Sequence, residues 1–125
     1  MTNAGEIKGI EAVVTTLTVG ATTAVGDVIH LEADGKYDPV ADADKGKFAV
    51  ALDAGTDGTV IRAVIWGRVT VTATAAAIKK GALVMAGDTA KVAASDAGAV
   101  GEVVGTAMEE FASGAVGTIW VGLGN

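Results

Sequence analysis

The stretch Gly46–Val71, with the sequence GKFAVALDAGTDGTVIRAVIWGRVTV, decides the fold. In its first part the apolar residues alternate, so that Phe48, Val50 and Leu52 fall on one face of an extended chain. The dipeptide Asp57-Gly58 then offers a tight turn, because glycine accepts a positive φ. A longer run rich in Val and Ile follows. The stretch therefore predicts two β-strands joined by a turn, and neither strand carries a catalytic constellation.

The second strand of this hairpin has one apolar face and one mixed face. The apolar face is expected to line the core and consists of Ile61, Ala63, Ile65, Gly67, Val69 and Val71. The mixed face consists of Val60, Arg62, Val64, Trp66, Arg68 and Thr70. Because Trp and Arg are enriched at the centres of protein interfaces, the subunit-interface candidates are Arg62, Trp66 and Arg68.

The rest of the chain also consists of short apolar runs separated by glycines. Gly accounts for 18 of the 125 residues and Pro for only 1, and the glycines interrupt short runs of Val, Ile and Thr. This pattern predicts many short strands with tight turns in one all-β domain, a sandwich or a barrel. The best candidate for a helix is residues 73–80, ATAAAIKK, which end before a glycine.

The sequence contains a weak internal repeat, which we call the internal echo. Residues 26–46, GDVIHLEADGKYDPVADADKG, resemble residues 81–101, GALVMAGDTAKVAASDAGAVG. The pair Trp66-Gly67 is likewise echoed by Trp120-Val121-Gly122. Two similar β-motifs packed into one barrel or sandwich would produce this echo, and so would a composition rich in Ala and Gly.

The bulk properties do not indicate nucleic acid, a membrane or a disulfide framework. The chain has no Cys, which excludes disulfides and cysteine nucleophiles. Its net charge is -6 and its Lys and Arg residues are scattered, whereas phosphate binding requires a basic face. No apolar run approaches the roughly 20 residues of a membrane-spanning helix. Glu6, Lys8 and Glu11 stand where a secretory signal would be apolar.

The residues that usually carry chemistry form no recognisable site. His30 is the only histidine, and no serine or aspartate constellation surrounds it in the sequence. The aspartates that would suggest a calcium loop lack the EF-hand spacing; they are Asp38, Asp42, Asp44, Asp53 and Asp57. The glycines at 98, 101 and 105 lack the spacing of a dinucleotide-binding loop. We therefore expect no enzyme activity, no metal and no cofactor.

The order and composition of these segments resemble those of a known protein family. A strand, an Asp-Gly turn and the segment KFAVALDAGTDGT (47–59) precede a strand that ends in GRVTV (67–71). The second half, KKGALVMAGDTAKVAASDAGAVGEVVGTAMEE (79–110), is followed by a terminal Trp-Val strand. Over roughly residues 20–125, this arrangement is similar to the tailed-phage capsid decoration (cement) proteins, the lambda-type head decoration and small capsid cement family.

The resemblance implies a mainly β fold, a small β-barrel or β-tulip-like single domain with at most one or two short helices. It also implies a structural virion protein without enzyme activity. Such a protein is made in the host cytoplasm and binds the major capsid protein on the outside of an expanded icosahedral shell. It sits there as a homotrimer at three-fold positions and stabilises the head.

The resemblance also divides the chain. Residues 1–20 would be an N-terminal arm or first strand that contacts the capsid, and residues 21–125 the β-rich decoration domain. The capsid-contact candidates, which would add as a strand to the edge of a capsid sheet, are Ile7, Ile10, Val13, Val14 and Leu17. An ordinary first strand is the other interpretation of these residues. The arms of the family are rich in Pro, whereas this chain has no Pro before Pro39.

A small carbohydrate-binding or surface-adhesion β-module is the alternative function. A module of that kind needs a row of exposed aromatic side chains, and this chain has only two Trp, one Tyr and two Phe. The composition therefore favours the structural virion protein.

Overall fold

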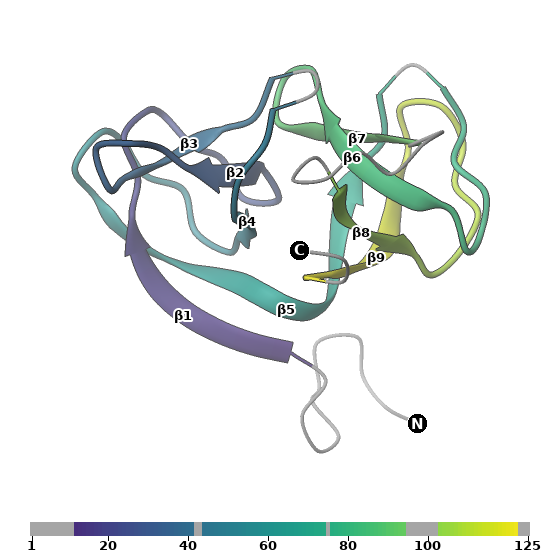
Figure 1. Cartoon of the computed structure of the whole chain (residues 1–125), viewed down its shortest axis with the longest axis horizontal. Helices are drawn as coiled ribbons and strands as arrows, with labels where there is room; N and C mark the ends of the chain where they lie inside the picture. The colour runs from purple at the N-terminus through teal and green to yellow at the C-terminus, as the bar shows by residue number, and fades with distance from the viewer. Residues whose placement is uncertain (1–11, 42–43, 75, 95–102, 123–125) are drawn as a thin grey trace.

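The computed structural model describes residues 12–41, 44–74, 76–94 and 103–122 as an all-β domain (Figure 1). The described residues contain no helix. The strands are β1 (Ala12–Thr18), β2 (Val28–Leu31), β3 (Tyr37–Pro39), β4 (Phe48–Ala51), β5 (Val60–Thr72), β6 (Leu83–Gly87), β7 (Lys91–Ala94), β8 (Val103–Ala107) and β9 (Val116–Val121). The prediction of a small, mainly β single domain is confirmed.

The strands form one curled antiparallel sheet that resembles half a barrel. Along the sheet the order is β3-β2-β4-β5-β9-β8-β6-β7, and β1 pairs with β5 outside this path. In Figure 1 the earlier strands lie at the left and the later ones at the right, and β5 runs from one group to the other. The hairpin predicted from the sequence is β4 and β5, whose partners include Val50 with Val64. Gly58 in its turn has φ 87.

The helix predicted over residues 73–80 is wrong. Ala73 forms a bridge with Val92, and Ile78 forms one with Phe111. The Ile78 N–H donates to the Phe111 carbonyl at 2.9 Å, and the Phe111 N–H donates back at 2.9 Å. An alanine-rich run has a high helix propensity, but pairing with distant strands overrides propensity in a short segment.

The two halves of the domain are built on one plan. In the first half β1 pairs with β5, β2 with β3 and with β4, and β4 with β5. In the second half β5 pairs with β9, β6 with β7 and with β8, and β8 with β9. The isolated bridges repeat as well, since Val19 pairs in parallel with Tyr37 as Ala73 pairs with Val92. The internal echo in the sequence is therefore a true structural duplication.

Strand β5 belongs to both halves. Its beginning is the last strand of the first half, and its end is the first strand of the second half. Gly67 marks the change, because it is the partner of Ala12 on β1 and of Val121 on β9. Gly67 has φ 113, and Gly122, which follows β9, has φ 99. Residues with a side chain rarely adopt such angles, so both junctions require glycine.

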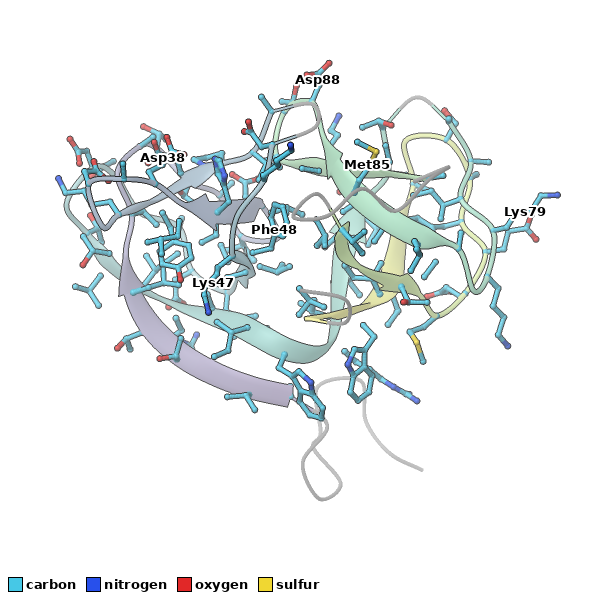
Figure 2. The ribbon with its side chains drawn as sticks, viewed as in Figure 1. Asp38, Lys47, Phe48, Lys79, Met85 and Asp88 are labelled. Carbon is cyan, nitrogen blue, oxygen red and sulfur yellow. The ribbon has the colours of Figure 1, made fainter. Side chains whose placement is uncertain are left out.

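The apolar core spans both halves. Phe48 of β4 lies in the interior, 5% exposed (Figure 2). The cluster around it includes Val28, Val50, Val64, Val71, Ile78, Val84, Val104 and Ile119. A smaller cluster uses the alternate residues of β2 and β4 and consists of Val19, Ile29, Ala49, Ala51, Ile61 and Ala63. Strands β2 and β4 are therefore buried on both faces.

The turn between β6 and β7 ties the second half to the first through the backbone. The Val28 N–H donates to the carbonyl of Ala90 at 2.9 Å, and the Ala90 N–H donates to the carbonyl of Val40 at 2.9 Å. Thr89 and Ala90 have φ 61 and 62, which non-glycine residues seldom adopt. The hydrogen bonds to the first half offset part of the cost of this conformation.

The faces predicted for β5 are wrong in the middle of the strand. Val64 is 3% exposed, whereas Ile65 is 37% exposed. Val13 and Val14 are successive residues of β1, yet they pair with Trp66 and Val64, so Ile65 has no partner there. This β-bulge adds one residue to β5 and reverses the alternation, which places Val64 in the core.

Candidate functional site

Four side chains gather on the outer surface where β1, β5 and β9 meet. Trp66 lies directly opposite Val13 on β1, and Arg68 lies directly opposite Trp120 on β9. Residues in such positions share a face of the sheet. The two indole rings are in contact, with centroids 4.8 Å apart and planes at 84°. We call Val13, Trp66, Arg68 and Trp120 the tryptophan patch.

The tryptophan patch is a partly solvated apolar surface with one cation. Val13 is 40% exposed and Trp66 37% exposed, Arg68 is exposed, and Trp120 is half-buried. Edge-to-face contact of aromatic rings is favourable beyond the area that it buries. An apolar surface with Trp and Arg has the composition of an interface centre.

Glycines hold the two tryptophans in place. A Cβ on Gly122 would lie 3.0 Å from Cδ1 of Trp66, so the indole packs on bare backbone. A Cβ on Gly105 of β8 would overlap the carbonyl oxygen of Trp120. The Nε1 of Trp120 is buried and has no hydrogen-bond partner among the described residues. Trp120 is therefore fixed by packing.

Trp120 was not among the candidate residues named from the sequence. Its signal was the echo of Trp66-Gly67 in Trp120-Val121-Gly122. In the duplicated plan Trp66 faces β1 as Trp120 faces β5. Once the echo is accepted as a duplication, it places both tryptophans at equivalent positions. The contact between the two tryptophans depends on how β5 joins the halves, and no local feature of the sequence indicates that geometry.

Arg62 does not join the tryptophan patch. Its guanidinium forms an ion pair with Asp53, with Nη2 to Oδ1 at 2.8 Å and Nε to Oδ2 at 3.0 Å. The Arg62 backbone N–H also donates to Oδ2 of Asp53 at 2.9 Å. These hydrogen bonds lower the pKa of Asp53 to about 2 and raise the pKa of Arg62. Of the three predicted subunit contacts, the structure brings Trp66 and Arg68 together and leaves Arg62 paired elsewhere.

The capsid-contact candidates that the structure describes lie on β1. Val13 and Val14 are 40% and 45% exposed. Leu17 is partly buried and packs against the smaller apolar cluster, so it supports the fold. Ile7 and Ile10 lie outside the described residues. Because Val13 lies opposite Trp66, Val13 belongs to the tryptophan patch, whereas Val14 lies opposite the buried Val64 and so faces the other side of the sheet.

His30 is buried, at 7% exposed, and the polar groups that the described residues place against its ring are acceptors. Its Nδ1 lies 2.8 Å from the carbonyl oxygen of Lys45. Its Nε2 lies 3.1 Å from Oε2 of Glu32 and 3.3 Å from Oδ2 of Asp44. The ring stacks on Phe48, with centroids 6.4 Å apart. The contacts described for the ring include no serine, threonine or cysteine side chain.

Three of the five aspartates noted in the sequence have separate local partners in the structure. Asp57 forms an ion pair with Lys36 at 3.2 Å, and Asp53 pairs with Arg62. Asp44 accepts the N–H of Ala41 at 2.8 Å. Within the described ranges, no group of three or more His, Asp or Glu side chains is arranged to hold a metal ion. Asp42 lies outside those ranges. The same described ranges contain no helix long and apolar enough to span a membrane.

No protein-family model matches the sequence, and no curated protein matches it either. Among solved structures, the fold is similar to that of the head fiber gp8.5 N base in bacteriophage phi29, with a TM-score of 0.64 and 17% sequence identity. The similar region covers 89% of this chain and 94% of the other. At this identity the likeness shows that the two chains share a fold.

Proposed function

We propose that this chain is a structural protein of a phage head that binds the outside of the expanded capsid and stabilises it. The observation that carries the proposal is the fold, which is similar over almost its whole length to the base of a phage head fiber. The proposal goes further in naming a cement role, a homotrimer at three-fold positions and the major capsid protein as partner.

The surface chemistry supports a binding role. The tryptophan patch, to which β1 contributes Val13, offers several modest apolar contacts with a cation at one side. Repeated in a trimer, such contacts add up through multivalency, so no single site needs to be tight. A protein that binds only the assembled, expanded shell stabilises that shell by linkage. The net charge of -6 favours solubility before assembly.

The carbohydrate-binding alternative is less well supported. Sugar rings stack on the open faces of aromatic side chains, whereas the two indoles here stand at 84° with the edge of one against the face of the other. Trp120 is also half-buried.

Co-sedimentation with capsids tests the proposal. Purified protein is mixed with expanded shells that lack it and, separately, with compact precursor shells. We expect saturable binding to the expanded shells only, in multiples of three per three-fold position. Sedimentation equilibrium of the free protein reports whether the trimer exists before binding. Absence of binding to both shells would overturn the proposal, and a glycan array would then test the adhesion module.

A pair of variants on β5 tests the contact surface. Trp66→Ala should weaken binding to expanded shells at least tenfold, since a tryptophan at an interface centre commonly contributes about 2 kcal/mol or more. Thr70→Ala is the matched control, because Thr70 is exposed on the same strand outside the tryptophan patch. Equal binding of the two variants, with unchanged thermal stability, would place the contact on another surface.

A further inference from the structure

The hydrogen-bonding partners that the described residues supply to the His30 ring are all acceptors. The Lys45 carbonyl faces Nδ1 at 2.8 Å, so that nitrogen must carry a proton to bond with it. The carboxylates of Glu32 and Asp44 face Nε2 at 3.1 and 3.3 Å. In a neutral imidazole one ring nitrogen is a bare lone pair. In this pocket that lone pair would point at an oxygen, so only the imidazolium satisfies both sides.

We propose that His30 is a pH-sensitive latch, whose imidazolium holds Asp44 and Lys45, in the loop between β3 and β4, against the end of β2. Two of its partners, Asp44 and Lys45, belong to that loop, and Glu32 directly follows β2. Loss of the proton leaves a lone pair facing two carboxylates and removes the charge-assisted hydrogen bonds. The latch therefore holds at lower pH and is released as the pH rises.

Strands β3 and β4 flank His30 on either side of β2. On β3, Asp38 lies directly opposite His30, and one of its carboxylate oxygens, Oδ1, is buried without a hydrogen-bond partner in the described part of the chain. On β4, Phe48 lies opposite His30 and supplies an aromatic face, and Lys47 before it is exposed. Among the described residues, the carboxylates that contact the ring are therefore those of Glu32 and Asp44, whereas Oδ1 of Asp38 is directed at Gly20. The same loop also carries Lys45 and Lys47.

The duplication shows that the fold does not need this cluster. In the second half Met85 takes the place of His30, since it lies opposite Val103 and Ala93 as His30 lies opposite Phe48 and Asp38. Figure 2 shows Met85 on β6 in the second half and Phe48 in the first. The same arrangement of strands therefore forms around an uncharged side chain. The charged cluster is a property added to one half.

Hydrogen exchange of the full chain tests the latch. NMR measures the exchange of the Ala41 and Asp44 amides, which bond within the loop, and of the Leu31 amide, which donates to the Lys47 carbonyl. The pH is varied between about 5 and 8, where histidine changes charge. After correction for intrinsic exchange, we expect protection to fall roughly tenfold as the pH rises, the effect of losing one charge-assisted hydrogen bond. His30 is the only histidine, so its ring signals report the charge state directly.

The matched variant is His30→Met, which installs the residue that the second half uses. Its protection at these three amides should not vary with pH, and His30→Gln serves if the Met variant does not fold. Amides of the β6–β7 hairpin are the internal reference and should be unaffected in every protein. Protection that is independent of pH in the natural chain overturns the latch. So does a pH dependence that persists in both variants, or a ring that is neutral at about pH 5.

Discussion

At the scale of single residues, corresponding positions in the two halves carry different chemistry. Asp53 accepts the backbone N–H of Arg62 at 2.9 Å, and Glu109 accepts the backbone N–H of Thr118 at 3.0 Å at the corresponding place. Only the first of these carboxylates has a guanidinium beside it. The backbone hydrogen bond thus belongs to the plan of both halves, and the ion pair is specific to one.

Asp53 should contribute to acid sensitivity. Its pKa is about 2, below the ordinary 3.8, because of the hydrogen bonds from Arg62. A depressed pKa gives stability that is present above about pH 3.8 and is lost as the pH falls towards about 2. Asp53→Asn should therefore lower Tm slightly at neutral pH and reduce the loss of Tm on acidification. Thermal melts across this range check it.

Glu109→Gln is the matched control for Asp53→Asn, because it alters a carboxylate that makes the same backbone hydrogen bond without an arginine. It should change the acid dependence of Tm less than Asp53→Asn does. If the two variants behave alike, the ion pair has no effect on stability and the backbone hydrogen bond accounts for the result.

Gly105 should tolerate no side chain. A Cβ there would overlap the carbonyl oxygen of Trp120, and the backbone of β9 cannot move aside without breaking the sheet. Gly105→Ala should cost roughly 2–3 kcal/mol, as overpacking of a tight core commonly does. Gly26→Ala is the control, because its Cβ meets open space and only its φ of 89 is strained, at about 1 kcal/mol. Urea unfolding compares the two, and an equal loss would contradict the close contact.

At the scale of the elements, β5 carries most of the organisation. It pairs with β1, β4 and β9, and its bulge at Ile65 decides which side chains enter the core. The sequence predicted the strand and its turn, because alternation and an Asp-Gly pair are local signals. It did not predict the bulge, which arises from the register with β1, far away along the chain.

The bulge predicts that substitutions at two neighbouring positions differ strongly in their effect on stability. Val64→Ala should lower the free energy of unfolding by roughly 1.5–3 kcal/mol, because Val64 is buried among side chains of both halves. Ile65→Ala should change it by no more than about 0.5 kcal/mol, because Ile65 is partly exposed and removed from the ladder with β1. Denaturant titrations measure both. The reverse order would mean that β5 alternates without interruption.

The segment 73–80 shows the limit of local propensity. Its composition favours a helix, yet Ala73 is bridged to Val92 of β7 and Ile78 to Phe111 in the loop between β8 and β9. Single helical turns are marginal in isolation, so one pair of tertiary hydrogen bonds suffices to decide the outcome. The candidate surface likewise depends on pairing between distant parts of the chain. Trp66 and Arg68 were predicted from composition, whereas Trp120 comes into contact with Trp66 only through the pairing of β5 with β9.

At the scale of the whole molecule, neither half has a complete core of its own. Val28 and Phe48 of the first half share one apolar cluster with Val84 and Ile119 of the second. The Ala90 backbone adds two hydrogen bonds across the junction. Both halves also need β5, so the loss of one half exposes the core of the other.

The domain should therefore unfold in one step. Calorimetry should give a single transition whose calorimetric and van't Hoff enthalpies agree. Val64→Ala in the first half and Val84→Ala in the second should each shift that whole transition, although the substitutions lie in different halves. A fragment that ends at Thr72 contains every strand of the first half and should remain unfolded. A second transition, or a folded fragment, would show that the halves are independent.

The pairing of Gly67 with both Ala12 and Val121 has a consequence for how the chain can be rewired. Antiparallel partners stand about 5 Å apart, so the start of β1 and the end of β9 lie within a short linker of each other. A circular permutant could then join the start of β1 to the end of β9 through a flexible peptide and open the chain at the Asp57-Gly58 turn. The order of the strands in the sheet would be kept although their order in the gene would change. Its thermal stability would report how far native pairing depends on the order in which the strands are synthesised.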